Sequence, residues 1–531
     1  MKIRSDILRI YQSIHTWVGI TAGIFLFIAF FAGALTMFKQ PIDDWMHKPL
    51  SKLSGVPETQ LDHLVSQVLQ QHPASKKNFQ ILLDAQQHAI VSWTEGKSGR
   101  ELGLNAHSWV ATLDAQGQLI SHQETPSKLA ELIDLLHRTG GIPGMLDDEH
   151  LGIYVMGVAS VLYFLALVSG VILLLPTLVK DFFALRPGKN RKRFWLDAHN
   201  IVGITSLPFH LVICLTAIVF AFHDQYYDAL NYFVSPVKTE VASVQSKKQV
   251  LAPVELFTPS RLLETIRLAS NQADIHKLES MNLESARPML RVALNNPRYL
   301  VRGPESGYLV LNPTNGKIMN ASMVPGKEGT WMAIVAPFFS LHFGSYGGDF
   351  VRWVYFFFGL CGAFLFYSGN LLWLEKRRKN QGQQTVSNRW MAATTVGICL
   401  GSIVAVICCM LAGLWCYQIH PNTNILFMPI YYTVFLSSLT WSYWRGAALA
   451  SVHLLWVCSL LLLAIPISSL LQNRSNNMNI NLVATCMACL FTYAAIKTSR
   501  RVQHGSKDSV WARKSVSLVT ENSSTSVNNP A

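Results

Sequence analysis

The sequence is poor in charge. Charged residues make up 14% of the 531 residues, whereas hydrophobic residues make up 50%. A soluble globular domain carries about 25% charged residues, so the composition excludes an ordinary soluble protein. Lys and Arg still outnumber Asp and Glu by 44 to 31, a formal charge of +13. Because these basic residues stand beside long apolar runs, we interpret them as topology signals, and nucleic acid is not expected as a partner.

The polar parts of the chain lack cysteine and lack a nucleotide-binding fingerprint. All 9 cysteines lie inside apolar runs, which excludes a disulfide framework or a thiolate zinc site in the polar segments. Cys486 and Cys489 have the spacing of a redox pair but share one apolar run, which favours packing. The basic polar segments contain no G-x-G-x-x-G and are too short for a nucleotide-binding domain.

What the chain has in abundance is apolar stretches near the roughly 20 residues that cross a bilayer. We expect an α-helical integral membrane protein with about eight spanning helices, at 14–38, 151–175, 199–222, 350–374, 391–417, 425–443, 446–471 and 480–496. The first stretch follows Lys2, Arg4 and Arg9 as a signal peptide would. Its apolar core is too long and no A-x-A exit follows, so we expect an uncleaved anchor.

The distribution of Lys and Arg predicts the orientation. They concentrate at the N-terminus, in 176–198, in 376–379 and after Lys497. Basic flanks resist translocation, and with eight spans these segments all fall on one side. We therefore expect cytoplasmic N- and C-termini, with 498–531 as a disordered cytoplasmic tail.

Two large polar segments, 39–150 and 223–349, then face outward. Each is expected to contain a helix followed by a small antiparallel sheet with Gly-containing turns. The expected elements are helix 58–71 with strands 79–83, 89–93 and 108–113, and helix 259–270 with strands 289–294, 298–302 and 307–311. The segments are interpreted as two copies of one small α+β module.

The membrane helices show the same duplication. His15 opens the run H-T-W-V-G-I-T and His199 opens H-N-I-V-G-I-T, identical at five of seven positions. Leu-His precedes the second and fourth helices, and Ser-Gly stands near the far end of both. Residues 1–190 and 191–380 are therefore expected to be parallel tandem repeats, followed by a four-helix membrane domain at 381–497.

The duplication arranges histidines in matched pairs at two depths. His15 and His199 stand at the cytoplasmic ends of helices one and three, and His137 and His342 stand outside, before helices two and four. Two neutral imidazoles that face each other across a helix bundle can ligate one haem iron axially. We therefore expect two haem b groups, one at each pair. The alternative for each histidine is a hydrogen-bonded core or interface residue.

Glycines on the same helices are consistent with close approach of a porphyrin. Gly19 and Gly23 follow His15 by four and eight residues, and Gly203 follows His199 by four. Small residues also serve tight helix packing in membranes, so both interpretations remain open.

Three further histidines are cofactor candidates. His210 lies 11 residues after His199, on nearly the same helix face and just after a kink expected at Pro208. Its repeat counterpart is Leu26, so it cannot be half of a symmetric pair. An asymmetric haem ligand, a proton relay and a hydrogen-bonded core residue all remain open for it. The other two candidates, for the outer haem, are His150 and His223.

These motifs, in this order, resemble the PepSY-associated transmembrane proteins, which include iron-regulated membrane proteins and ferric-siderophore reductases of bacterial inner membranes. The matching pieces are Arg9 to His15-x-Trp17-x-Gly19, Leu136-His137-Arg138, Ser169-Gly170 before Pro176, the His199 unit, and Leu341-His342-x-Gly344 with Gly347-Gly348. The resemblance covers about 1–380, and the two outer segments resemble PepSY modules.

The resemblance implies a haem-containing protein of the bacterial inner membrane that passes electrons outward to ferric iron held by a periplasmic siderophore. Reduction to Fe(II) loosens the grip of hard oxygen donors on the iron, so such a ferric-chelate reductase needs no nucleophile or general base. The expected partners are a ferric siderophore, membrane lipid and a quinol or separate cytoplasmic electron donor. Trp331 and Tyr346 could contact a substrate or anchor the membrane interface.

Two other functions are compatible with the sequence. One is a non-redox PepSY membrane protein that binds or regulates a periplasmic partner such as a peptidase, although an anchor does not need matched histidines. The other is a transporter of an iron chelate. A transporter predicts charges near the membrane midplane, whereas the first four spans contain almost no ionisable residue apart from histidine.

Overall fold

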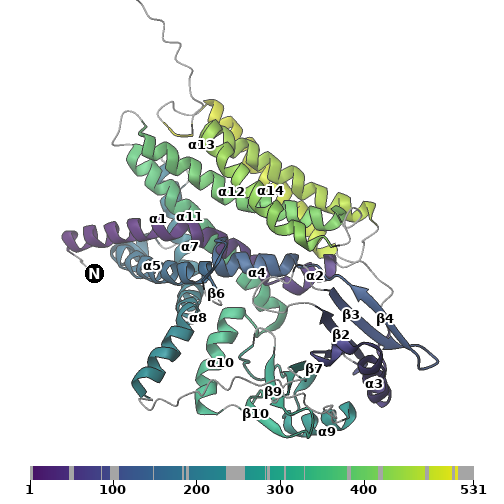
Figure 1. Cartoon of the computed structure of the whole chain (residues 1–531). Helices are drawn as coiled ribbons and strands as arrows, with labels where there is room; N and C mark the ends of the chain where they lie inside the picture. Colours follow the sequence, from purple (N-terminus) through teal and green to yellow (C-terminus); the bar gives the residue numbers. More distant parts are fainter. Residues whose placement is uncertain are drawn as a thin grey trace, which may run out of the picture.

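Long apolar helices make up most of the structure, beside an eight-stranded antiparallel sheet and a short two-stranded one (Figure 1). The computed structural model describes residues 4–46, 53–84, 86–95, 104, 107–146, 149–181, 184–186, 191–234, 258–281, 283, 288–303, 306–327, 329–378, 384–416, 422–472, 478–504 and 509–511. Seven helices within these residues are long and apolar enough to cross a membrane. The chain is a multi-pass membrane protein.

Helices from the part of the chain that ends at Arg378 build a bundle. Its members are α1 (Ser5–Thr36), α5 (Leu151–Leu174), α7 (Arg191–Thr205), α8 (Leu207–Val234) and α11 (Gly348–Arg378). Helix α1 packs against α5 and α11, and α5 packs against α8. The end of the bundle where α1 leads into the sheet is called the sheet end below, and the end where α1 begins is called the distal end.

The third expected helix is broken. It begins at Arg191 instead of residue 199 and is interrupted at Ser206, between α7 and α8. Pro208 follows the break by two residues, and its ring nitrogen has no hydrogen to donate to the carbonyl one turn back. The kink expected at Pro208 is confirmed.

The C-terminal helices are α12 (Val386–Trp415), α13 (Asn424–Leu471) and α14 (Met478–His504). Helix α13 has 48 residues and a non-helical Gly446, with φ 75° and ψ 155°. Trp441 Nε1 donates to His453 Nδ1 at 3.2 Å, although 12 residues of straight helix would span about 18 Å. The chain therefore folds back at Gly446, and the two arms correspond to the expected stretches 425–443 and 446–471. This turn is why seven long helices account for eight apolar stretches.

One eight-stranded antiparallel sheet joins the two polar segments. Its order is β10-β9-β8-β7-β1-β2-β3-β4. The strands are β1 (Gln80–Leu83), β2 (Ala89–Glu95), β3 (His107–Leu113), β4 (Leu119–Glu124), β7 (Asp274–Met281), β8 (Met289–Asn295), β9 (Gly307–Leu311) and β10 (Ile318–Met323). A helix precedes each group of four strands: α3 (Leu61–Gln71) and α9 (Pro259–Ala269).

The centre of the sheet is the pair β1 and β7, where Ile81 lies opposite Leu278. Asp62 on α3 reinforces the junction, because its carboxylate accepts from Ser260 N at 2.8 Å and from Ser260 Oγ at 2.6 Å. The strand expected at 298–302 is wrong, since this stretch forms a turn and irregular backbone. The second group still has four strands, because β7 precedes the expected strand 289–294 in the chain.

Short elements connect the sheet to the bundle. They are α2 (Lys39–Met46), η1 (Glu58–Gln60), η2 (Pro73–Lys76), α4 (Leu129–Thr139), the hairpin β5 (Met145–Leu146) and β6 (Glu149–His150), η3 (Leu175–Thr177), α6 (Leu178–Asp181) and α10 (Thr330–Phe343). Helices α4 and α10 each end at a left-handed glycine, Gly140 and Gly344, with φ of 60° and 64°. A residue with a side chain is strained there, so glycine fixes the helix end. The expected disorder of 498–531 concerns mostly residues outside those described, and α14 continues to His504.

Candidate functional site

Four histidines face one another in two pairs, one at each end of the bundle. The distal pair is His15 on α1 and His199 on α7, with ring centroids 6.3 Å apart and ring planes at 86°. The sheet-end pair is His137 on α4 and His342 on α10, with centroids 6.1 Å apart and planes at 38°. An imidazole nitrogen binds a metal such as zinc at about 2.0–2.1 Å, so two rings on opposite sides of one ion stand roughly 6 Å apart between centroids. Both pairs fit that spacing.

In the distal pair each Nδ1 has a hydrogen-bond acceptor. His15 Nδ1 lies 2.8 Å from the carbonyl oxygen of Ala166. A carbonyl only accepts, so His15 donates through Nδ1–H. His199 Nδ1 lies 2.9 Å from Ser368 Oγ, and that hydroxyl already donates to Leu365 O at 3.1 Å. The serine hydrogen is therefore committed, and His199 is the donor in its bond to Ser368.

The sheet-end pair follows the same rule. His137 Nδ1 lies 2.8 Å from the carbonyl oxygen of Ala29 in α1. His342 Nδ1 lies 2.8 Å from Thr216 Oγ1 on α8, whose hydroxyl donates to Val212 O at 2.8 Å. Both sheet-end histidines are thus assigned as Nδ1–H donors.

The four hydrogen bonds select one tautomer. With hydrogen on Nδ1, a neutral imidazole carries its lone pair on Nε2, the nitrogen that binds a metal in this form. Within the described part of the chain, none of these four histidines makes a hydrogen bond through Nε2. The donor set fits a group that takes one nitrogen from each side. Groups of three or more His, Cys, Asp or Glu that could hold a metal ion are absent from the described residues.

Glycines allow the histidines to approach neighbouring helices. A Cβ on Gly33 of α1 would lie 2.7 Å from His137 Nδ1, and a Cβ on Gly170 of α5 would lie 3.0 Å from His15 Cε1. The repeated Ser-Gly of the sequence therefore packs at the distal histidines. Gly19 has no atom within 4 Å of such a Cβ, whereas Gly23 meets Phe366 at 3.3 Å. Gly23 thus serves helix packing, and Gly19 borders open space on the face of His15.

A buried acid anchors the start of α7. Asp197, two residues before His199, is buried. It forms ion pairs with Arg186 at 2.9 Å and with Arg193 at 3.2 Å. Paired in this way, a carboxylate can remain buried, and the pairing holds the helix that carries His199. Sequence reasoning missed this residue because an acid inside a basic segment gives no motif.

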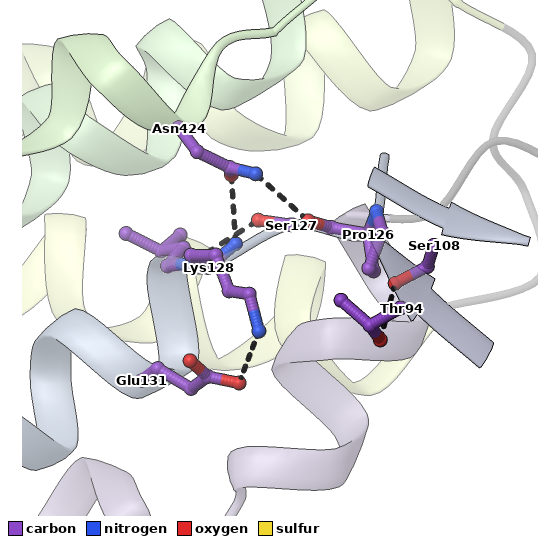
Figure 2. Close-up of polar contacts among 8 residues, drawn as sticks. Thr94, Ser108, Pro126, Ser127, Lys128, Glu131 and Asn424 are labelled. Atoms are coloured by element: carbon purple, nitrogen blue, oxygen red, sulfur yellow. Dashed lines mark hydrogen bonds and ion pairs between the residues drawn. The ribbon is translucent and has the colours of Figure 1, made fainter. Parts of the chain in front are cut away.

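Helix α4, which carries His137, is held at both ends by α13. Asn424 Oδ1 accepts from Lys128 N at 2.8 Å, and its Nδ2 donates to Pro126 O at 2.9 Å (Figure 2). Tyr432 OH donates to Gly141 O, just past the helix, at 3.3 Å. The Asn424 side chain thus satisfies the N–H of Lys128, the N-cap residue of α4, which is one of the backbone donors that the start of a helix leaves without a partner.

Apolar packing completes the support of α4. Leu132, Ile133 and Leu136 belong to one buried cluster with Phe427 and Tyr431 of α13. Residues of α12 and α14 also line this cluster. The C-terminal helices therefore build one wall around the helix that positions His137.

His210 lies between the two pairs along the bundle. It is 0% exposed and is surrounded by the rings of Phe30, Phe209 and Tyr163, at 5.3, 5.3 and 6.0 Å between centroids. Among the residues that the structure describes, neither ring nitrogen of His210 has a hydrogen-bond partner, and the Tyr163 hydroxyl also lacks one. His210 is thus not brought to either histidine pair.

The other candidates lie at helix ends. His150 is buried in β6, directly before α5. His223 is exposed, with Nδ1 2.8 Å from Phe220 O and Nε2 3.1 Å from Asp224 Oδ1, so both of its nitrogens are engaged. Tyr346 OH lies 3.0 Å from Tyr355 OH, near the end of α10. The side chain of Trp331 lies outside the described residues.

Comparison with known proteins gives one family match. The family model of the PepSY-associated TM region matches residues 12–376, more than half of the chain. The match includes all four paired histidines and both Ser-Gly motifs. No curated protein matches the sequence.

Proposed function

We propose that this chain, which belongs to the PepSY-associated transmembrane family, is a haem b-containing reductase of the bacterial inner membrane. It would pass electrons across the membrane to ferric iron held by a siderophore, giving Fe(II) for uptake. One observation carries the proposal: four histidines on four helices form two facing pairs, each ring donating through Nδ1 and keeping Nε2 for a metal.

The proposed architecture is a tandem repeat with two PepSY-like modules. Residues 1–190 and 191–380 each carry a distal histidine, a helix with four strands and a sheet-end histidine. The sheet order, symmetric about β1 and β7, supports a twofold relation between the modules. Basic residues in the last turn of α11, Lys376, Arg377 and Arg378, support a cytoplasmic distal end. The sheet would then stand in the periplasm.

In the proposed mechanism the role of the protein is to bind and orient the haems. His15 and His199 would hold one haem and His137 and His342 the other, and the haems supply one-electron chemistry when bound. Ser368 and Thr216 keep their histidines in the metal-binding tautomer. Electron supply would come from a membrane quinol or a separate cytoplasmic donor.

The sheet end is the proposed delivery side. His342 lies at the end of α10, and Ser340, two residues earlier, bonds to both Val301 N at 3.0 Å and Val301 O at 2.7 Å. The periplasmic module thereby fixes the helix that carries the histidine. A siderophore that docks on the modules would bring Fe(III) close to the outer pair, and reduction would weaken its hold by oxygen donors.

A reoxidation experiment tests this function. The purified full-length protein is reduced with dithionite, freed of excess reductant and mixed with a ferric trihydroxamate siderophore, while an Fe(II) chelator traps the product. We expect the haem bands to return to the oxidised form as Fe(II) appears in equal amount. A haem-loaded protein that stays reduced with this chelate and with a ferric catecholate would contradict the proposed activity.

A further inference from the structure

A layer of side chains from four helices separates the two histidine pairs. It consists of Phe30 on α1, Tyr163 on α5, His210 on α8 and Phe366 on α11, whose rings contact one another. Beyond it, Ala29 bonds to His137 and Ala166 bonds to His15. His210 and Tyr163 are the polar members of this layer.

His210 contributes no hydrogen bond to the fold. Both of its ring nitrogens and the Tyr163 hydroxyl are buried without a partner in the described residues. Burial of a polar group that forms no hydrogen bond is unfavourable. The repeat alignment supplies the apolar comparison, because Leu26 occupies the equivalent place in α1 and is 3% exposed. A fold that accommodates leucine at one copy does not need histidine at the other.

We propose that His210 is a proton-binding site whose protonation accompanies the entry of one electron into the haem-loaded protein. This inference rests on the proposed function. An added electron places negative charge in an apolar interior, where charge interacts strongly because the dielectric constant is low. One electron arrives from the donor while the neutral imidazole takes one proton from water and becomes imidazolium. When the electron leaves to Fe(III), His210 releases the proton to water.

The neighbouring groups suit this role. The oxygen of Tyr163 can accept a hydrogen bond from an N–H of imidazolium. Cys214, one turn further on α8, already donates to Ser160 O at 3.1 Å. On α11, Tyr355 packs against Phe209 and donates to Leu341 O at 2.6 Å. Described acidic and basic side chains make no hydrogen bond with His210, which leaves its imidazole as the basic nitrogen of this layer.

The test measures the haem midpoint potentials of the purified holoprotein between about pH 5 and pH 8, the range in which imidazole changes charge. One proton taken up per electron changes the equilibrium constant tenfold per pH unit, which is about 59 mV for a one-electron couple. We expect the wild-type midpoint potential of the first haem to be reduced to fall as pH rises, with a slope that approaches this value. His210→Leu, which copies Leu26, should bind the same amount of haem and lose most of the slope.

Two further variants make the result decisive. His210→Gln keeps a polar side chain that does not titrate, so this variant should also lose most of the slope. It provides the same test if leucine impairs folding. His504→Phe removes an exposed histidine at the end of α14, outside both pairs, and should retain the wild-type slope. A pH-independent wild type, an unchanged slope in both His210 variants, or haem loss in both would overturn the proposal. Absence of haem from the wild type would instead contradict the proposed function.

Discussion

The hydroxyl groups beside the paired histidines accept hydrogen bonds from the rings and help to fix their tautomer. Ser368 receives the Nδ1–H of His199, and no other acceptor for that hydrogen lies in the described contacts of the ring. His15 has two acceptors within reach, the carbonyl of Ala166 at 2.8 Å and Ser169 Oγ at 3.3 Å. The two repeated serines are therefore unequal in importance.

We expect Ser368→Ala to weaken haem binding at the distal pair by roughly 10–100-fold, the usual effect of losing the partner of a metal-binding histidine. Ser169→Ala should have a smaller effect because the Ala166 carbonyl remains. Haem affinity is measured by titration of the apoprotein. Ser402→Ala, at a buried serine bonded only within α12, is the control. Equal affinities for all three variants would show that the tautomer is set by other contacts.

Gly33 provides a steric test of the sheet-end pair. A methyl group there would lie 2.7 Å from His137 Nδ1, too close for the ring to keep its position. Gly33→Ala should therefore displace His137 and lower haem content at this pair, measured per protein in purified samples. Gly19→Ala meets open space and should leave the sheet-end pair intact. Full haem content in Gly33→Ala would mean that the ring does not ligate from this position.

Sequence alone could identify the residues of both pairs, because the duplicated runs align His15 with His199 and His137 with His342. The recurrent Ser-Gly also marked Ser368, although its contact with a histidine needed the structure. Thr216 and the carbonyls of Ala29 and Ala166 gave no signal. Backbone acceptors are independent of side-chain type, so a sequence pattern cannot reveal them.

At the scale of elements, the position of α4 depends on helices distant in the sequence. Asn424, 1% exposed, satisfies backbone groups at both Pro126 and Lys128. These contacts give the C-terminal helices a definite structural role: they fix the helix that carries His137.

Asn424→Ala should leave the half-buried N–H of Lys128 and carbonyl of Pro126, at the start of α4, without their partner, a cost of about 1 kcal/mol. We expect a lower melting temperature and a changed spectrum or potential for the sheet-end haem, with the distal haem unaffected. Asn370→Ala is the matched control, since this buried asparagine joins α11 to α12 through Thr395 and does not contact α4. Identical perturbation of the haem by both variants would refute a specific role for Asn424.

Helix composition predicted the membrane elements well, because length and hydropathy are local properties. The sheet was harder. Residues 298–302 form a turn although a strand was expected, and β7 was missed. The pairing of β1 with β7, about 200 residues apart in sequence as in the Phe79–Ser280 bond, is a tertiary contact without a local signature.

At the scale of the molecule, the net charge of +13 supports the proposed cytoplasmic orientation of the distal end. Reporter fusions test this orientation. Alkaline phosphatase inserted at the turn Asp114–Gly117 should be active, and a C-terminal fusion should be inactive, because that enzyme folds only where disulfides form. A C-terminal fluorescent protein is the complementary control. The reverse pattern would invert the proposed direction of electron transfer.

Haem content measures the central claim most directly. Absorption spectra of the purified protein before and after dithionite, with haem quantified per chain, are compared with those of the double variants His15→Ala/His199→Ala and His137→Ala/His342→Ala. We predict reduced bands of six-coordinate haem b, two haems in the wild type and one in each double variant. A colourless wild type after expression with ample haem, or undiminished haem in both double variants, would contradict the account.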